Sequence, residues 1–140
     1  MISGEIKSVE KAIERAKALG GKIIKLNVSG AFHSPLMAPV QKALKEYLDS
    51  MNFAPLKFDF VSNVTGKKVA NEVRAKELLP EQLVKMVLWW FDCMKTITDT
   101  VDFGFELGGG VLTGLVKYDF PLFCYLAIDE FQKLEKISFS

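Results

Sequence analysis

The sequence predicts an α/β domain built around a mainly parallel sheet. Apolar residues recur at helical spacing over residues 5–19, whereas residues 22–28 and 58–64 are short runs of the kind that form strands. Strand-like and helix-like runs alternate along the rest of the chain, which is typical of a layered α/β fold. A length of 140 residues suits one core, so we expect residues 1–140 to form a single domain.

The first half of the chain is expected to place two helices between short strands. Gly20-Gly21 ends the first helix, and Ser34-Pro35 fits an N-cap followed by proline at the first position of the second helix. Thr65-Gly66 is a turn signal. The predicted elements are a strand tail at residues 1–4, a helix at 5–19, a strand at 22–28, a helix from 34 to about 51, and a strand at 58–64.

The second half is expected to continue this alternation. The predicted elements are one bent helix or two helices at residues 74–87 and 88–100, a buried strand at 103–107, a helix at 111–117, a strand at 123–126 and a helix at 128–136. The glycines at 108–110 follow a strand and precede a helix, where backbone N–H groups can bind a phosphate. Without GxGxxG or GK[ST], a tight backbone crossing is the favoured interpretation.

Composition excludes several functional classes. Eighteen basic and seventeen acidic side chains give a net charge of +1 without a basic patch, which argues against nucleic-acid binding. Cys93 and Cys124 lack the spacing of a zinc site or a disulfide framework, so a reducing cytoplasm is expected. Neither a signal peptide nor a membrane span is expected. Apolar residues form 49% of the chain and include eleven phenylalanines, which suggests that part of this surface meets a partner.

His33 is the only histidine, and it lies between a strand-like run and a helical pattern. An imidazole titrates near neutral pH, so it can take a proton from a hydroxyl and return it within one catalytic cycle. From the residues alone, the favoured interpretation is that His33 is a helix-start residue that satisfies nearby backbone groups. Adjacent side chains rarely converge on one proton, so Ser34 is interpreted as a helix cap. Cys93, Trp89 and Trp90 are interpreted as core or rim residues.

Several motifs together resemble malonyl-CoA:acyl carrier protein transacylases, a family of acyltransferases in fatty-acid synthesis. The resemblance covers most of the chain, and the motifs occur in the family's order. They are ISGE at residues 2–5, LNVSGAFHSPLM at 26–37, VSNVT at 61–65, EQL at 81–83 with VLW at 87–89, and ELGGGVLTGLVK at 106–117.

The resemblance implies a fold that corresponds to the C-terminal half of the family's domain. About residues 1–30 would be the end of a small ferredoxin-like subdomain, and about residues 31–140 the C-terminal part of a large hydrolase-like subdomain with a parallel sheet. Some positions depart from the family pattern: Ala31 and Met86 replace prolines, Glu81 replaces an arginine, and the triglycine segment is one residue shorter.

The resemblance also implies a two-step reaction that needs no bound cofactor. A serine attacks malonyl-CoA, and the acyl-enzyme passes malonate to the phosphopantetheine thiol of acyl carrier protein. His33 would be the general base and acid, and the Gln82 backbone carbonyl would orient its ring. Phe32 and Asn63 would contact the substrate, with the bulk of Phe32 favouring malonyl over methyl-branched acyl groups.

The family's nucleophile motif, GHSxG, does not occur in this sequence. The resemblance therefore implies a truncated chain that is inactive alone, needs an N-terminal half carrying the serine, and tends to self-associate through uncovered apolar faces. The expected partners are that half, acyl carrier protein and the coenzyme A thioester, with neither nucleic acid nor membrane. The alternative is a freestanding, non-catalytic α/β module that binds or scaffolds something else.

Overall fold

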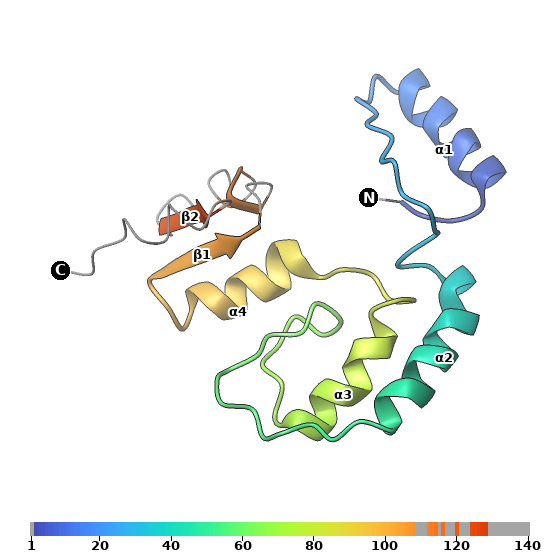
Figure 1. Cartoon of the computed structure of the whole chain (residues 1–140). Coiled ribbons are helices and arrows are strands. Elements are labelled where there is room, and N and C mark those ends of the chain that lie inside the picture. Colours follow the sequence, from blue (N-terminus) through green and yellow to red (C-terminus); the bar gives the residue numbers. More distant parts are fainter. Residues whose placement is uncertain (1, 109–111, 115, 117–119, 121–123, 129–140) are drawn as a thin grey trace.

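The structure is a computed structural model that describes residues 2–108, 112–114, 116, 120 and 124–128. Helices dominate these residues, and a short two-stranded sheet lies at one end (Figure 1). The elements, in chain order, are α1 (Ile6–Ala18), the 3₁₀ turn η1 (Pro35–Met37), α2 (Ala38–Asp49), α3 (Glu72–Glu81), the π-helical turn η2 (Trp89–Cys93), α4 (Met94–Thr98), β1 (Phe103–Leu107) and β2 (Cys124–Ile128).

The sheet pairs β1 with β2 in parallel, as the sequence predicted. The register runs from Phe103 opposite Cys124 to Leu107 opposite Ile128. Parallel neighbours need a crossover connection, and residues 112–114 and 116 between the two strands are helical. Of the helix predicted at 128–136, Ile128 belongs to β2, and the remainder lies outside the described residues.

Three predicted strands are absent. Residues 2–4 and 22–28 are irregular, and the segment 58–64 contributes only an isolated antiparallel bridge between Val61 and Lys68. A strand is stable only when a neighbour satisfies its backbone groups, and none of the described residues lies alongside 22–28 as a strand. The strand predictions for residues 1–4, 22–28 and 58–64 are therefore wrong: the sequence pattern is typical of strands, but the described residues offer these segments no strand to pair with.

The helical predictions need shorter bounds. The predicted second helix is split into η1 and α2, and the predicted helix at 74–87 is α3, which ends at Glu81. Beyond α3 the backbone turns, and the N–H of Leu88 donates to the carbonyl of Asn63 at 2.8 Å instead of continuing a helix. The predicted helix at 88–100 is η2 followed by the short α4.

Local sequence explains the C-terminal end of α1. Its apolar side chains lie on one face, and Gly20 follows it in the left-handed conformation, with φ of 77°. The N–H groups of Gly20 and Gly21 donate to the carbonyls of Lys17 and Ala16 at 2.9 and 2.8 Å, which closes the helix in the Schellman pattern. Gly20-Gly21 ends the helix as predicted.

Two small cores hold the described residues together. One joins Val69, Ala75 and Leu78 beneath α3, and the other joins Met94 of α4 to Val116 with Trp89 packed against them. The Nε1 of Trp89 is buried with no hydrogen-bond partner among the described residues.

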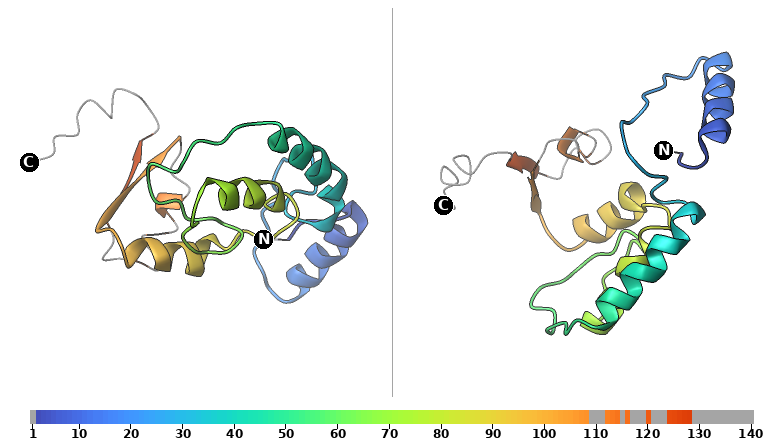
Figure 2. Two further views of the ribbon diagram at one scale, coloured as in Figure 1. Left: turned by 90° about the horizontal axis from the view of Figure 1, so that it is seen from below. Right: turned by 45° about the vertical axis from the view of Figure 1, so that its right-hand side comes forward.

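The helix α1 stands apart from these cores. In Figure 1 and in both views of Figure 2, α2 lies beside α3, whereas α1 lies at the end of an extended connection. None of its side chains is buried. In the part of the chain that the structure describes, no helix is both long and apolar enough to cross a membrane.

Candidate active site

His33 has an unusual backbone conformation. Its φ is 62°, in the left-handed region, and it is the one non-glycine residue with positive φ among those described. This region is unfavourable for a residue with a Cβ atom and recurs at functional sites, where surrounding contacts hold it. The N–H of His33 donates to the carbonyl of Leu83 at 2.8 Å, so a distant segment fixes this backbone.

The imidazole of His33 is bound to the same segment. Its Nδ1 lies 2.8 Å from the carbonyl oxygen of Gln82, the contact that the family resemblance implied. A carbonyl can only accept, so in the neutral ring Nδ1 carries the proton of this bond and Nε2 has the lone pair. The side-chain Nε2 of Gln82 is farther away, at 3.4 Å from the same ring nitrogen. The ring is half-buried, and its Nε2 is the nitrogen able to accept a proton.

The end of α3 supplies these two carbonyls. The last carbonyls of a helix have no partner within it, so they are free to accept from elsewhere. Asn71 starts α3 by accepting the N–H of Arg74 at 2.9 Å, and Ala75, Leu78 and Pro80 bury its inner face. The Asn71 cap and the buried face hold α3 in place, and its C-terminus presents the two carbonyls to His33.

Ser34 does not cap the following helix, contrary to the sequence interpretation. It occupies the N-cap position of η1, but its hydroxyl makes no capping bond. The hydroxyl instead donates to the carbonyl of Ala31 at 2.7 Å, and the side chain is buried. No Ser-His pair forms, because the hydroxyl is engaged on the backbone before His33.

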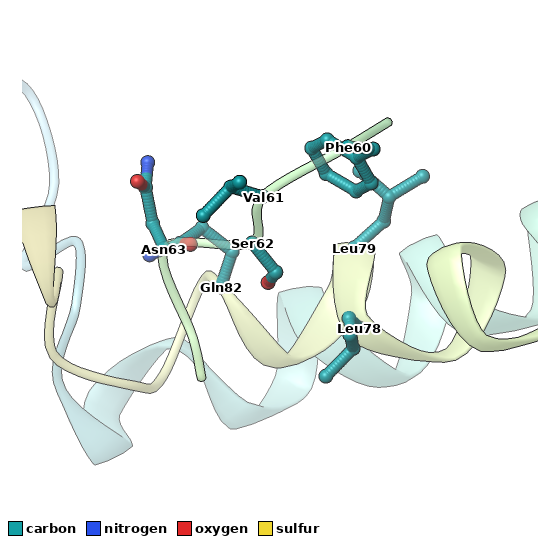
Figure 3. Close-up of a pocket in the computed structure, with 7 residues that line it drawn as sticks. All are labelled: Phe60, Val61, Ser62, Asn63, Leu78, Leu79 and Gln82. Carbon is teal, nitrogen blue, oxygen red and sulfur yellow. The ribbon is translucent and has the colours of Figure 1, made fainter. Parts of the chain in front are cut away.

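Asn63 and Gln82 line one small pocket, of about 160 Å³. Figure 3 shows Asn63 at one end of this pocket and Phe60 with Leu79 at the other. The carbonyl of Asn63 accepts the N–H of Leu88 at 2.8 Å, which ties the 61–65 segment to the chain that follows α3. Gln82 thus contacts His33 through its carbonyl and shares this pocket with Asn63, whereas His33 is not among the residues that line the pocket.

Phe32 lies next to His33 in the chain but outside this pocket. Its side chain is 40% exposed. The ring folds back over Gly30, where an added Cβ would lie 3.2 Å from it. Phe32 therefore flanks the histidine with a partly uncovered aromatic face.

Cys93 is a buried thiol, as the sequence interpretation expected. Its Sγ lies 3.4 Å from Oδ1 of Asn63 and 3.6 Å from the carbonyl of Ser62. Burial, with a smaller contribution from the negative charge of Asp92, raises the pKa of Cys93 to about 11. A protonated, enclosed thiol is a poor nucleophile, so a Cys-His dyad is unsupported.

The segment after the triglycine does not offer a free anion site. The carboxylate of Glu106 accepts the N–H groups of Leu112 and Thr113 at 3.1 and 2.7 Å, and the Thr113 hydroxyl at 2.7 Å. Its negative charge occupies the place that a phosphate would need. Glycines 109 and 110 lie outside the described residues. Among those described, no cluster of metal-ligating side chains occurs.

Sequence reasoning missed two of the contacts that build this site. These are the hydrogen bond from the His33 N–H to the Leu83 carbonyl and the one from the Ser34 hydroxyl to the Ala31 carbonyl. Residue types do not predict either contact, because both acceptors are backbone carbonyls whose positions depend on the fold. The one available signal was proximity in the chain: Leu83 follows Gln82, and Ser34 follows His33.

The chain is similar to known proteins in sequence and in fold. No family model matches the chain. The malonyl CoA-acyl carrier protein transacylase of Bacillus subtilis is 42% identical over 119 residues, which are 84% of this chain and 38% of that protein. The chain therefore spans about two fifths of the length of this curated relative.

Solved structures share the fold. The malonyl CoA-acyl carrier protein transacylase of Clostridium perfringens is 34% identical, with a TM-score of 0.83 over 95% of this chain and 42% of that one. A malonyl-transacylase (PlMCAT) solved with the type II polyketide acyl-carrier protein AntF is 30% identical, with a TM-score of 0.85 over 94% of this chain and 43% of that one. By sequence and by fold, this chain matches the C-terminal part of malonyl CoA-acyl carrier protein transacylases.

Proposed function

We propose that this chain supplies the histidine side of an acyltransferase active site that moves malonyl from coenzyme A to acyl carrier protein. The observation that carries the proposal is the contact between Nδ1 of His33 and the Gln82 carbonyl, which leaves Nε2 as a base. A carbonyl here does the orienting work that an aspartate does in other triads. The names of the relatives supply the substrate class, malonyl-CoA, and the acyl carrier protein.

The chemistry requires a nucleophile that reacts twice. A serine hydroxyl, supplied by an N-terminal half with the GHSxG motif, gives its proton to Nε2 of His33 and attacks the malonyl thioester carbonyl. The imidazolium returns the proton to the departing coenzyme A thiolate. Nε2 then takes the proton of the phosphopantetheine thiol, whose sulfur attacks the serine ester, and the proton returns to the serine oxygen. The bonds and protons of both transfer steps balance without a metal or a redox cofactor.

Exposed apolar side chains support the need for a partner half. Between residues 2 and 28, six large apolar side chains are more than half exposed, although a packed domain would cover them. These are Ile2, Ile6, Leu19, Ile24, Leu26 and Val28. We propose that residues 1–30 and 31–140 act as parts of one domain whose remaining surface the N-terminal half covers.

Reconstitution tests this function. The full 140-residue chain is mixed with the part of the Bacillus subtilis relative that this chain does not match, and transfer of radiolabelled malonyl to acyl carrier protein is followed. We expect transfer in the mixture and none from either part alone. Transfer by this chain alone would mean that it holds its own nucleophile, and no transfer from a mixture that forms a complex would favour a non-catalytic module, which the comparisons do not favour.

His33→Ala tests the role of the histidine in the same mixture. Loss of a general base costs about 10²- to 10⁴-fold in rate. We expect a loss in this range with unchanged binding between the two parts. Ser50→Ala is a suitable control, because its exposed hydroxyl contacts only the Tyr47 carbonyl in the described structure. A transfer rate for the His33→Ala mixture within tenfold of the parent rate would contradict the role of His33 as the base.

A further inference from the structure

We infer that Ser34 is a positioning residue that holds His33 in its left-handed conformation and thereby selects the tautomer of its ring. The inference rests on the proposed role of His33 but is tested without it. The inference concerns the hydroxyl of Ser34, which takes no part in the proposed reaction. In the described structure the Ser34 hydroxyl contacts the Ala31 carbonyl and not Gln82, so any effect of Ser34 on the reaction acts through His33.

The hydroxyl closes a turn around His33. Ser34 is 5% exposed, and its Oγ donates to the carbonyl of Ala31 at 2.7 Å. Ala31 and Ser34 flank the two residues Phe32 and His33, so this one bond spans the left-handed residue. The backbone carbonyl of Ser34 also accepts the N–H of Met37 at 3.1 Å, which joins the turn to η1.

The turn and the end of α3 hold His33 from two sides. On one side, the Leu83 and Gln82 carbonyls accept the backbone N–H and the ring Nδ1, each at 2.8 Å. On the other side, the hydroxyl of Ser34 fixes the backbone from which both donors project. A residue with a Cβ leaves the left-handed region when its restraints weaken. Relaxation of φ then swings the ring away from Gln82.

A single histidine makes the consequence directly measurable. The full chain is labelled with ¹⁵N, and the two imidazole nitrogens are assigned at a pH where the ring is neutral. We expect the parent to show one protonated nitrogen, Nδ1, with a slowly exchanging proton. We also expect Ser34→Ala to lose that slow proton, to shift both nitrogens toward the averaged values of a free imidazole, and to speed exchange of the His33 amide about tenfold.

Two further variants separate the hydroxyl from the space that it fills. Ser34→Thr keeps the hydroxyl on an extended backbone, with φ of −135° and ψ of 160°, which β-branched residues adopt readily. We expect it to retain the parent tautomer. Ser34→Cys keeps the size but donates weakly, so we expect the shift seen with alanine. If Ser34→Ala unfolds the chain, the comparison of Ser34→Thr with Ser34→Cys still tests whether the hydroxyl sets the tautomer.

Ser50→Ala is the matched control. Ser50 donates to the carbonyl three residues earlier, Tyr47, at the same 2.7 Å, but on an exposed helix end away from His33. We expect Ser50→Ala to leave the imidazole signals unchanged. Parent-like ring signals in folded Ser34→Ala or Ser34→Cys would overturn the inference, as would an equal change in Ser50→Ala.

Reconstituted enzyme gives an independent readout. If the proposed function holds, Ser34→Ala lowers kcat and leaves KM for malonyl-CoA unchanged, and Ser34→Thr restores kcat. If reconstitution yields no transfer, the proposed function fails while the imidazole signals still report on Ser34. Transfer that is lost with His33→Ala but is normal with Ser34→Ala and Ser34→Cys would overturn the inference alone.

Discussion

At the scale of single residues, backbone atoms determine the site as much as side chains do. The ring of His33 is oriented by a main-chain carbonyl, and its own N–H is held by the next one along. Main-chain acceptors tolerate changes of side chain at Gln82 and Leu83, provided that α3 keeps its end. A side-chain substitution at Gln82 therefore leaves its contact with His33 in place, whereas substitutions at Phe32 and Cys93 remove the side chain whose effect is being tested.

Phe32 provides a test of acyl selectivity. We expect Phe32→Ser to raise the ratio of methylmalonyl to malonyl transfer in the reconstituted mixture, because a smaller side chain leaves room for the extra methyl group. One methyl group in a pocket changes selectivity by about 10- to 200-fold at most. Competition between the two thioesters measures the ratio. Phe58→Ser, at an 85% exposed ring, is the control, and an equal ratio in both variants would contradict the role of Phe32.

Cys93 should resist alkylation. With a pKa of about 11 instead of the ordinary 9.0, its thiolate is about 100-fold scarcer near pH 8 than that of a free cysteine. In a Cys124→Ser background, we expect iodoacetamide to react at least that much more slowly with the folded chain than with the chain in urea. Equal rates would show that the thiol is accessible.

The same raised pKa makes stability dependent on pH. The folded state keeps the proton that the unfolded state releases, so the contribution is fully present below about pH 9 and is lost as the pH rises toward about 11. We expect the free energy of unfolding to fall across this window in the Cys124→Ser chain. Cys93→Ala should flatten that part of the profile, which urea unfolding at several pH values measures.

At the scale of elements, individual polar contacts hold several short segments near the site in place. Asn71 begins α3, and Glu106 binds the start of the helical residues 112–114. Gly66 ends the 61–65 segment in the left-handed conformation, with φ of 67°. Its carbonyl accepts the Thr96 hydroxyl at 2.7 Å, which joins this segment to α4. These contacts hold short elements that could not be stable alone.

Glu106 should contribute more to stability than an exposed carboxylate. Glu106→Ala leaves the partly buried N–H of Leu112 and the buried N–H of Thr113 without this acceptor, which costs about 2–3 kcal/mol in the free energy of unfolding. Glu77→Ala removes only an exposed ion pair with Arg74 and should cost less than about 0.5 kcal/mol. Urea titration compares the two, and equal costs would contradict the role of Glu106.

At the scale of the whole molecule, burial is uneven. Two small cores lie around α3 and α4, whereas α1 and the connection to residue 28 bury no side chain. The exposed side chains in this segment include Leu19 at 82% and Ile24 at 73%. With a net charge of only +1, charge repulsion opposes association weakly.

We therefore expect the isolated chain to self-associate. Sedimentation at increasing concentration should show a rising mass, and an apolar dye should gain fluorescence. Ile24→Lys should reduce both effects, because it places a charge within the uncovered segment. Val73→Lys, at a 59% exposed valine on α3, is the matched control. A monomer at high concentration without dye binding would contradict the expectation.

The sequence alone determined the features that are encoded locally. The apolar periodicity and Gly20-Gly21 predicted α1, the pattern at 103–107 predicted β1, and the motif around His33 pointed to the family. Tertiary structure decided what depends on distant partners. Residues 22–28 have the composition of a strand but no neighbour to pair with, and Ser34 binds Ala31 instead of capping a helix. Carbonyls about fifty residues away accept the N–H and the ring of the left-handed His33, a restraint that no local pattern encodes.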